Sequence, residues 1–419
     1  NKKIIINFNN EKAISILSYL ILAIILIIPT FRIYQNSLSY DYPCCFIGTD
    51  SFVHYAFTDF IANGGGPDVA PTYIAHTTID FLTDQPPLYY SIVAELAMFT
   101  GFETHQIIYA FAIILLINSL LLIYFLMRKY DLTVTFFSTP FLLITFIPYY
   151  SRILQIGQWV DNYGIFLLVA CIFITYHYLG NKIINKKPLF IVLTILISAI
   201  MLSHTEWVYF IFILIIYFFL TFILKRQDFN FKSIYIFALM FFVAFLIAIP
   251  YLIKLIATTG ANSIFDELNF EIKELIGMPI LLSDFSLLTL FFLFSGVIFL
   301  LYRLFFKKEI NFLIISSLSI FLLGFSYIIG FGRANEIRYF CPIFIAIFFG
   351  TSIKKIIFWF KDPFIKYYLM YSSIFIILLL LFFPFQAQTS IFGVKRSLWS
   401  GVEWIRDNTE KNATVLFIT

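Results

Sequence analysis

Long runs of apolar residues recur along this 419-residue chain, separated by short polar stretches. A transmembrane helix needs about 20 mainly apolar residues, and fewer when neighbouring helices shield it. A chain that is 61% hydrophobic and 12% charged is far more apolar than a soluble globular protein. The sequence therefore predicts an all-α polytopic membrane protein. Roughly eleven spans are expected, at 13–31, 107–127, 132–149, 165–179, 189–203, 207–224, 234–252, 287–305, 312–329, 339–353 and 368–383.

Charged residues between the spans predict the topology. If the N-terminus is cytoplasmic, most basic residues fall inside, as the positive-inside rule requires. They include Lys2, Lys3, Arg128, Lys129, Lys186, Lys187, Lys225, Arg226, Lys307, Lys308, Lys354 and Lys355. Acidic residues then crowd the outer face, which predicts a polar chamber there. We expect an integral protein of a prokaryotic cell membrane with its active face and C-terminus outside. The net charge of +4 reflects this topology rather than a basic domain, so no nucleic-acid partner is expected.

The sequence divides into a transmembrane module and a C-terminal segment. Residues 1–386 form the expected transmembrane module, which includes two long outer loops at 32–106 and 256–285. Loops of that length are usually functional or disordered, and their aromatic content argues against disorder. Residues 387–419 change in composition and predict a helix followed by a strand, as at the start of an extracytoplasmic domain. The chain begins with Asn and stops in the strand-like segment, so both ends are expected to be incomplete.

Asp50 and His54 stand in the first outer loop and are the first candidate site residues. On a helix, Asp50, His54 and Thr58 share one side, and Phe52 lies roughly opposite. A carboxylate there can accept a proton from an acceptor group, or orient it, with or without a metal ion. Asp is also a good N-cap for the following helix. The residues alone leave both interpretations open.

Asp161 is expected at the outer entry to the fourth span, on the same side as Asp50. An Asp-Asn pair before a helix is also an ordinary cap. Arg333 and Arg338 are expected at the outer end of the tenth span, where a guanidinium can bind phosphate oxygens. An interfacial anchor, or an ion pair with Glu336, is the alternative role for these arginines.

His204 and Glu206 fall in a short outer turn between the fifth and sixth spans, beside Trp207. Polar residues crowded against the bilayer predict an accessory functional role. A capped hairpin with a tryptophan in the interfacial belt is the structural alternative. The four cysteines give neither a disulfide framework nor a zinc spacing, and no nucleotide-binding motif is present. Energy for any transfer must then come from the donor itself.

Five short stretches of the sequence are informative because of the order in which they occur along the chain. They are Asp50-Ser51-Phe52-Val53-His54-Tyr55 with Gly64; Gln85-Pro86-Pro87-Leu88; Arg152, Gly157, Asp161, Asn162, Gly164 and Ile165; Arg338, Pro342 and Gly350; and Trp404-Ile405-Arg406-Asp407-Asn408-Thr409. The set resembles the C-type (GT-C) membrane glycosyltransferases, which take sugar from polyprenyl-phosphate carriers. Four stretches are similar to motifs of the oligosaccharyltransferase catalytic subunit, and the Pro-Pro-Leu turn is similar to that of protein mannosyltransferases.

The resemblance implies a GT-C fold and transfer of a sugar from a polyprenyl-phosphate-linked donor to a protein, lipid or glycan on the outer face. It implies that Asp50 acts as base or orienting group, assisted by Asp161 and His54, and that Arg338, with Arg333 second, binds the donor phosphate. His204 and Glu206 are accessory. No cofactor is certain; Mg²⁺ or Mn²⁺ on Asp50 and Asp161 is the one candidate. Membrane lipids are the other expected partners.

The sequence departs from the oligosaccharyltransferase motifs in two places, and these departures affect which member of the family it is expected to resemble. The oligosaccharyltransferase motif continues Asp-Asn-Glu, whereas this chain has Tyr163 at the third position, and the Trp-Trp-Asp acceptor motif is absent from the residues given. A monosaccharide transferase, or a divergent or inactive relative, fits these departures better than an N-glycosylating enzyme. The alternatives are a catalytically silent GT-C-like subunit that scaffolds a membrane complex, and a multi-span transporter.

Overall fold

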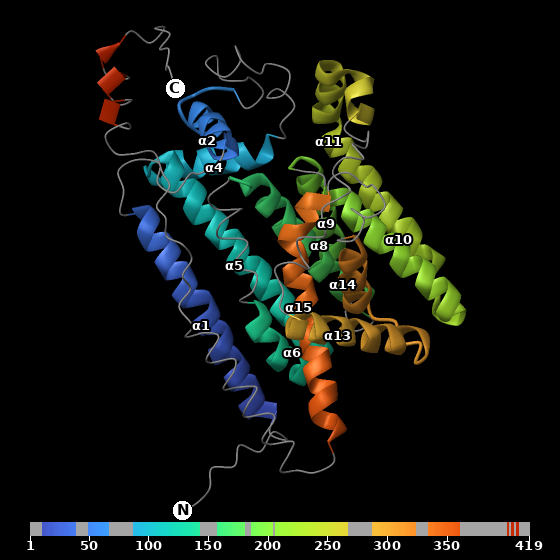
Figure 1. Ribbon diagram of the computed structural model, residues 1–419. Helices are drawn as coiled ribbons and strands as arrows, with labels where there is room; N and C mark the ends of the chain where they lie inside the picture. The colour runs from blue at the N-terminus through green and yellow to red at the C-terminus, as the bar shows by residue number, and fades with distance from the viewer. Residues whose placement is uncertain are drawn as a thin grey trace, which may run out of the picture.

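The computed structural model describes residues 11–38, 49–66, 87–142, 157–180, 186–203, 206–266, 287–323 and 334–360, with six positions between 400 and 409. All elements in this part of the chain are helices (Figure 1). They are α1 (Glu11–Leu38), α2 (Thr49–Ala62), α4 (Leu88–Thr100), α5 (Thr104–Tyr130), α6 (Leu132–Ser138), η1 (Thr139–Phe141), α8 (Trp159–Leu179), α9 (Lys187–Met201), α10 (Glu206–Leu224), η3 (Arg226–Asp228), α11 (Phe231–Asp266), α13 (Leu287–Phe305), α14 (Phe312–Leu323) and α15 (Ala334–Trp359).

Ten of the predicted spans overlap helices, although residues 143–149 and 324–329 of two of these spans lie outside the described residues. The eleventh span, 368–383, lies outside them entirely. By length and composition, four described helices could cross a membrane: Thr104–Tyr130, Trp159–Leu179, Glu206–Leu224 and Phe231–Tyr251. Five others are apolar but shorter. The all-helical membrane class is therefore confirmed in the described residues, whereas the full count of eleven spans stays a prediction.

Two regions that were predicted to lie outside the spans are described in part. Helix α11 continues to Asp266, so the first part of the predicted loop 256–285 is helical, although Pro250 lies inside the helix. Near the C-terminus the described positions around Trp404 are helical, as predicted for 398–408. The predicted strand at 414–418 lies outside the described residues.

The helices define two ends of a bundle. Helices α2 and α4 lie across one end, which we call the α2 end (Figure 1). Helix α5 also begins at this end. Its first residue, Thr104, donates a hydrogen bond to Asp59 of α2. Its 27 residues then carry the chain about 40 Å to the opposite end, where α6 begins. We call this opposite end the α6 end.

Helices α5 and α8 carry many residues of the buried core and pack against each other. Asn162 of α8 is buried and donates from Nδ2 to the backbone oxygen of Ala112 at 2.9 Å, which fixes the two helices together. Helices α10 and α11 instead expose large apolar side chains, including Ile215, Phe219 and Phe242. Exposed apolar surface of this extent is expected where a helix faces lipid or another protein.

Helix α15 packs against α13 and α6 through glycines. A Cβ added at Gly296 of α13 would overlap the backbone of Phe348 in α15. A Cβ added at Gly350 of α15 would overlap Ser138 and the Val134 carbonyl of α6. Such close backbone approach through small residues is the usual way that helices pack inside a membrane. The two glycines therefore fix where α15 crosses its neighbours.

We predict that Gly296→Ala destabilises the bundle by about 1–3 kcal/mol, because the added methyl group meets backbone that cannot move aside. The matched control is Gly180→Ala, where the nearest atoms lie at 3.4 Å. The measurement is the thermal unfolding midpoint of the detergent-solubilised protein. Equal midpoints for the two variants would show that α13 and α15 do not approach as described.

Candidate active site

Helix α2 carries the first two candidate residues. It begins at Thr49, so Asp50 lies within its first turn rather than before it. The side chain of Asp50 lies outside the described part of the chain. Gly64 has φ +92°, and its amide donates to the Ile61 carbonyl, which ends the helix just after Ala62. The helix that carries Asp50 and His54 is therefore closed by a glycine.

The polar side of α2 faces the protein. Ser51 and Thr58 are fully buried, and the Thr58 hydroxyl donates to the His54 carbonyl at 2.8 Å. Phe52, on the other side, is 40% exposed. Asp59, which interrupts the apolar pattern in the sequence, accepts the Thr104 hydroxyl at 2.8 Å. Asp59 therefore serves to join α2 to α5.

His54 is held by two aromatic residues. Its Nδ1 and the hydroxyl of Tyr90 lie 2.7 Å apart and share a hydrogen bond, which fixes the orientation of the imidazole. The ring centroid of Trp159 lies 6.2 Å from that of the histidine. Tyr90 belongs to α4 and Trp159 to α8, and both are buried. His54 thus stands where α2, α4 and α8 meet.

A glycine brings the start of α8 against the start of α2. Gly157 has φ +100°, a conformation that other residues rarely adopt. A Cβ added there would overlap the backbone N and Cα of Ser51. Gly157 precedes Asp161 by four residues, and Ser51 follows Asp50. The contact therefore places the helix turns that carry the two predicted catalytic carboxylates side by side.

Glu206 reaches the same region from α10. Its side chain is fully buried, and its carboxylate lies against Gly164, where a Cβ would overlap it. Gly164 is one turn beyond Asp161, which is half-buried in the first turn of α8. Three helix N-termini, those of α2, α8 and α10, therefore meet through two glycine contacts. Helix N-termini carry partial positive charge and stabilise carboxylates or bound anions.

Tyr163 occupies the position at which the resemblance implies a carboxylate. It is buried in an aromatic cluster, with its ring centroid 6.0 Å from those of Tyr89 and Phe111. Burial raises the pKa of the Tyr89 phenol well above its ordinary value, so this wall of the site stays neutral. The residue that replaces the expected carboxylate thus has a packing role.

The structure describes the remaining predicted site residues only in part. Arg338 lies in α15, sixteen residues before Lys354, which places its backbone about 24 Å toward the α2 end. The Arg338 side chain, Arg333 and His204 lie outside the described residues. Among the side chains that are described, no three of His, Cys, Asp or Glu lie close enough to hold a metal ion. The described residues alone therefore do not form a metal site.

Sequence reasoning did not single out Tyr89, Tyr90 or Trp159 as site residues. Two sequence features could have indicated them: an aromatic pair one residue after the two prolines, and a tryptophan two residues before Asp161. Pro87 is the N-cap residue of α4, and the helix begins at the next residue. The turn therefore positions Tyr90 against α2 and Tyr89 against Phe111 of α5 and Tyr163 of α8.

The fold is similar to that of a known membrane enzyme. No protein-family model matches the chain, and no curated protein sequence matches it. The oligosaccharyltransferase AglB of Archaeoglobus fulgidus, a GT-C enzyme, in complex with an inhibitory peptide and a dolichol-phosphate matches with a TM-score of 0.61 at 13% identity over 96% of this chain. The A. fulgidus oligosaccharyltransferase with Zn and sulfate gives 0.63 at 15% over 94%, and its apo form 0.60 at 14% over 98%.

The chain spans 58%, 55% and 59% of the lengths of these three structures. Such low identity shows the fold alone. The resemblance to GT-C enzymes is therefore confirmed for the fold.

The Gly164 contact predicts coupling between two residues of the site. We expect Gly164→Ala to lower stability by about 1–3 kcal/mol, because the methyl group displaces a buried carboxylate. In a Glu206→Ala background the same substitution should lower the free energy of unfolding clearly less, because the carboxylate that the methyl group would meet is then absent. A double-mutant cycle of unfolding free energies measures this. Additive free energies would contradict the contact.

Proposed function

We propose that this protein is a GT-C membrane glycosyltransferase that moves a sugar from a polyprenyl-phosphate-linked donor to an acceptor on the outer face. The observation that carries the proposal is the Gly157 contact with Ser51, because it joins the helix turns that bear Asp50 and Asp161. The similarity of fold to an oligosaccharyltransferase supports the reaction class.

The proposed reaction needs one proton acceptor and one stabilised leaving group. Asp50 takes the proton of the acceptor nucleophile, or orients it, while the new bond to the sugar forms. The bond between the sugar and the donor phosphate breaks, and the phosphate leaves as an anion. Arg338, or Arg333, binds that phosphate, and the α2 and α8 N-termini favour negative charge nearby.

His54 and Asp161 are the proposed assisting groups. His54 has a fixed ring because Tyr90 holds its Nδ1. Glu206 is the accessory carboxylate, and its burial against α8 supports a role in positioning Asp161 rather than in contacting substrate. A divalent ion, Mg²⁺ or Mn²⁺, would require Asp50 and Asp161 as ligands, and no step above is assigned to it.

The proposed orientation puts the α2 end outside the cell. Basic residues mark the end of α5, the start of α9 and the last turns of α15, all on the α6 side of the bundle. The positive-inside rule then places the α6 end in the cytoplasm. The apolar faces of the helices would hold the prenyl tail of the donor.

One observation favours a second candidate, a catalytically silent subunit. Tyr163 is packed into an aromatic cluster where the resemblance implies a carboxylate. A chain that has lost one acidic group can keep the fold and scaffold a membrane complex. No feature of the described residues favours the transporter alternative.

We predict that Asp50→Asn and Asp161→Asn each lower the transfer rate by at least about 100-fold without loss of folded protein. The matched control is Asp59→Asn in the same helix, which keeps an acceptor oxygen for Thr104 and should retain most activity. Purified protein in vesicles is supplied with polyprenyl-phosphate-linked sugars, and labelled product is counted.

The outcomes separate the two candidates. Transfer by Asp50→Asn at the wild-type rate contradicts the proposed role of Asp50. A wild-type protein that binds polyprenyl phosphate but transfers none of the tested sugars favours the silent subunit.

A further inference from the structure

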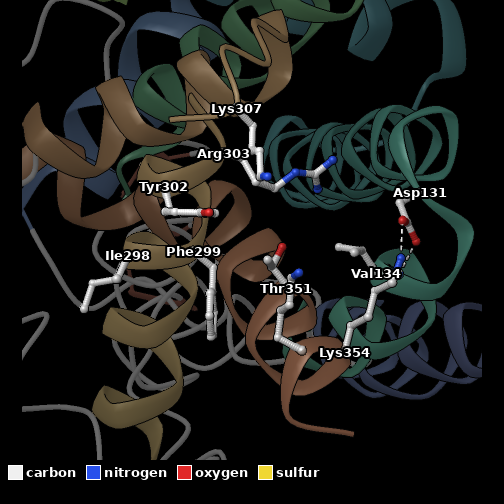
Figure 2. Close-up of a pocket in the computed structure, with 10 residues that line it drawn as sticks. Asp131, Val134, Ile298, Phe299, Tyr302, Arg303, Lys307, Thr351 and Lys354 are labelled. Carbon is white, nitrogen blue, oxygen red and sulfur yellow. Dashed lines mark hydrogen bonds and ion pairs between the residues drawn. The ribbon is translucent and has the colours of Figure 1, made fainter. Parts of the chain in front are cut away.

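A second candidate site lies at the α6 end, far from the carboxylates of the α2 end. Helices α6, α13 and α15 line a partly open cavity of about 610 Å³ (Figure 2). Its walls include Asp131, which caps α6, Val134 of α6, Tyr302 and Arg303 of α13, and Thr351 of α15. The transferase proposal uses none of these residues.

The lining of this cavity is strongly basic. Arg303, Lys307, Lys354 and Lys355 contribute four cations, and Asp131 contributes the one carboxylate among the lining residues. Figure 2 shows Lys354 directed at Asp131, while Arg303 of α13 and Lys307, two residues beyond the end of that helix, lie on another side of the cavity. A cavity with this charge balance attracts an anion.

Two of the four cations are already engaged. Lys354 forms an ion pair with Asp131. Arg303 donates to Glu309 from Nε at 2.7 Å and also to the hydroxyl of Tyr130. These contacts hold the walls in place and leave Lys307 and Lys355, both exposed, with no carboxylate partner among the described residues. These two lysines are therefore available to a ligand.

A buried hydroxyl adds a polar group to the same wall. Thr351 is 2% exposed and lines the cavity, and its Oγ1 has no hydrogen-bond partner in the described part of the chain. A buried polar atom without a partner costs free energy, which a bound oxygen-rich ligand would recover.

The surface beside the cavity is apolar. Phe291, Phe294, Ile298 and Tyr302 are each at least 40% exposed and recur at spacings of three and four, so they form one stripe along α13. Ile298 and Tyr302 also line the cavity. A ligand with an anionic head and apolar chains matches both surfaces, whereas a free phosphate matches the cavity alone.

We propose that this cavity binds the headgroup phosphate of an anionic phospholipid, with the acyl chains along the α13 stripe. The phosphodiester accepts hydrogen bonds from Lys307, Lys355 and Thr351, while Lys354 and Arg303 keep their present partners and add positive charge. Basic pockets between membrane helices are known to suit such headgroups. The proposal is independent of the transferase reaction.

The test is native mass spectrometry of the full chain in detergent, titrated with phosphatidylglycerol or with phosphatidylcholine of the same acyl chains. We expect tighter binding of phosphatidylglycerol, and a loss of about tenfold or more in Lys307→Gln/Lys355→Gln. The control, Lys129→Gln/Lys232→Gln, removes two exposed lysines outside the cavity and should change affinity by about twofold at most.

Three results would overturn the proposal. The first is equal affinity for the two lipids, and the second is an equal loss in both double variants. The third is displacement of phosphatidylglycerol by inorganic phosphate or glycerol 3-phosphate at lipid-like concentrations, since the ligand would then be a soluble phosphate. Thermal unfolding checks that each variant is folded, and Lys355→Gln alone replaces the double variant if that protein is unstable.

Discussion

The candidate site depends on one close backbone contact, that of Gly157 with Ser51. Only a residue without a side chain fits there, both because its φ is +100° and because a Cβ would meet backbone. The contact joins a helix of the predicted outer loop to a helix of the core, which are otherwise distant in sequence. Together with the ring contact between His54 and Trp159, it brings the turns that carry Asp50 and Asp161 next to each other. The second glycine contact, Gly164 with Glu206, adds α10 to the same junction.

The two ends of the bundle carry opposite chemistry. The α2 end gathers three helix N-termini, a fixed histidine and described carboxylates that include Asp59, Asp161 and Glu206. The α6 end holds a cavity lined by four cations and one carboxylate. One end suits a transfer reaction that develops negative charge on a leaving phosphate, and the other suits a permanent anion at the membrane surface. The buried α5 and α8 core separates the two ends and fixes their distance.

Local patterns predicted the helices well because each apolar run is itself the signal. The predicted span 287–305 has the bounds of α13, and 207–224 differs from α10 by one residue. Asp50, His54, Asp161 and Glu206 were also predicted as candidates from local chemistry. Contacts between distant segments leave no such periodic signal. The bond between Asp59 and Thr104, the Tyr90 hydroxyl on His54 and the basic cavity each require helices far apart in sequence to pack together. The role of Tyr163 likewise depends on Tyr89 and Phe111, which belong to other helices.

An experimental map of the full chain bound to a polyprenyl phosphate is the most direct test of the proposed site. We expect Gly157 in contact with Ser51 and the phosphate beside the starts of α2 and α8, within reach of Asp161 and of Arg338. A map in which the starts of α2 and α8 are apart, or in which the phosphate lies elsewhere on the protein, would contradict this expectation.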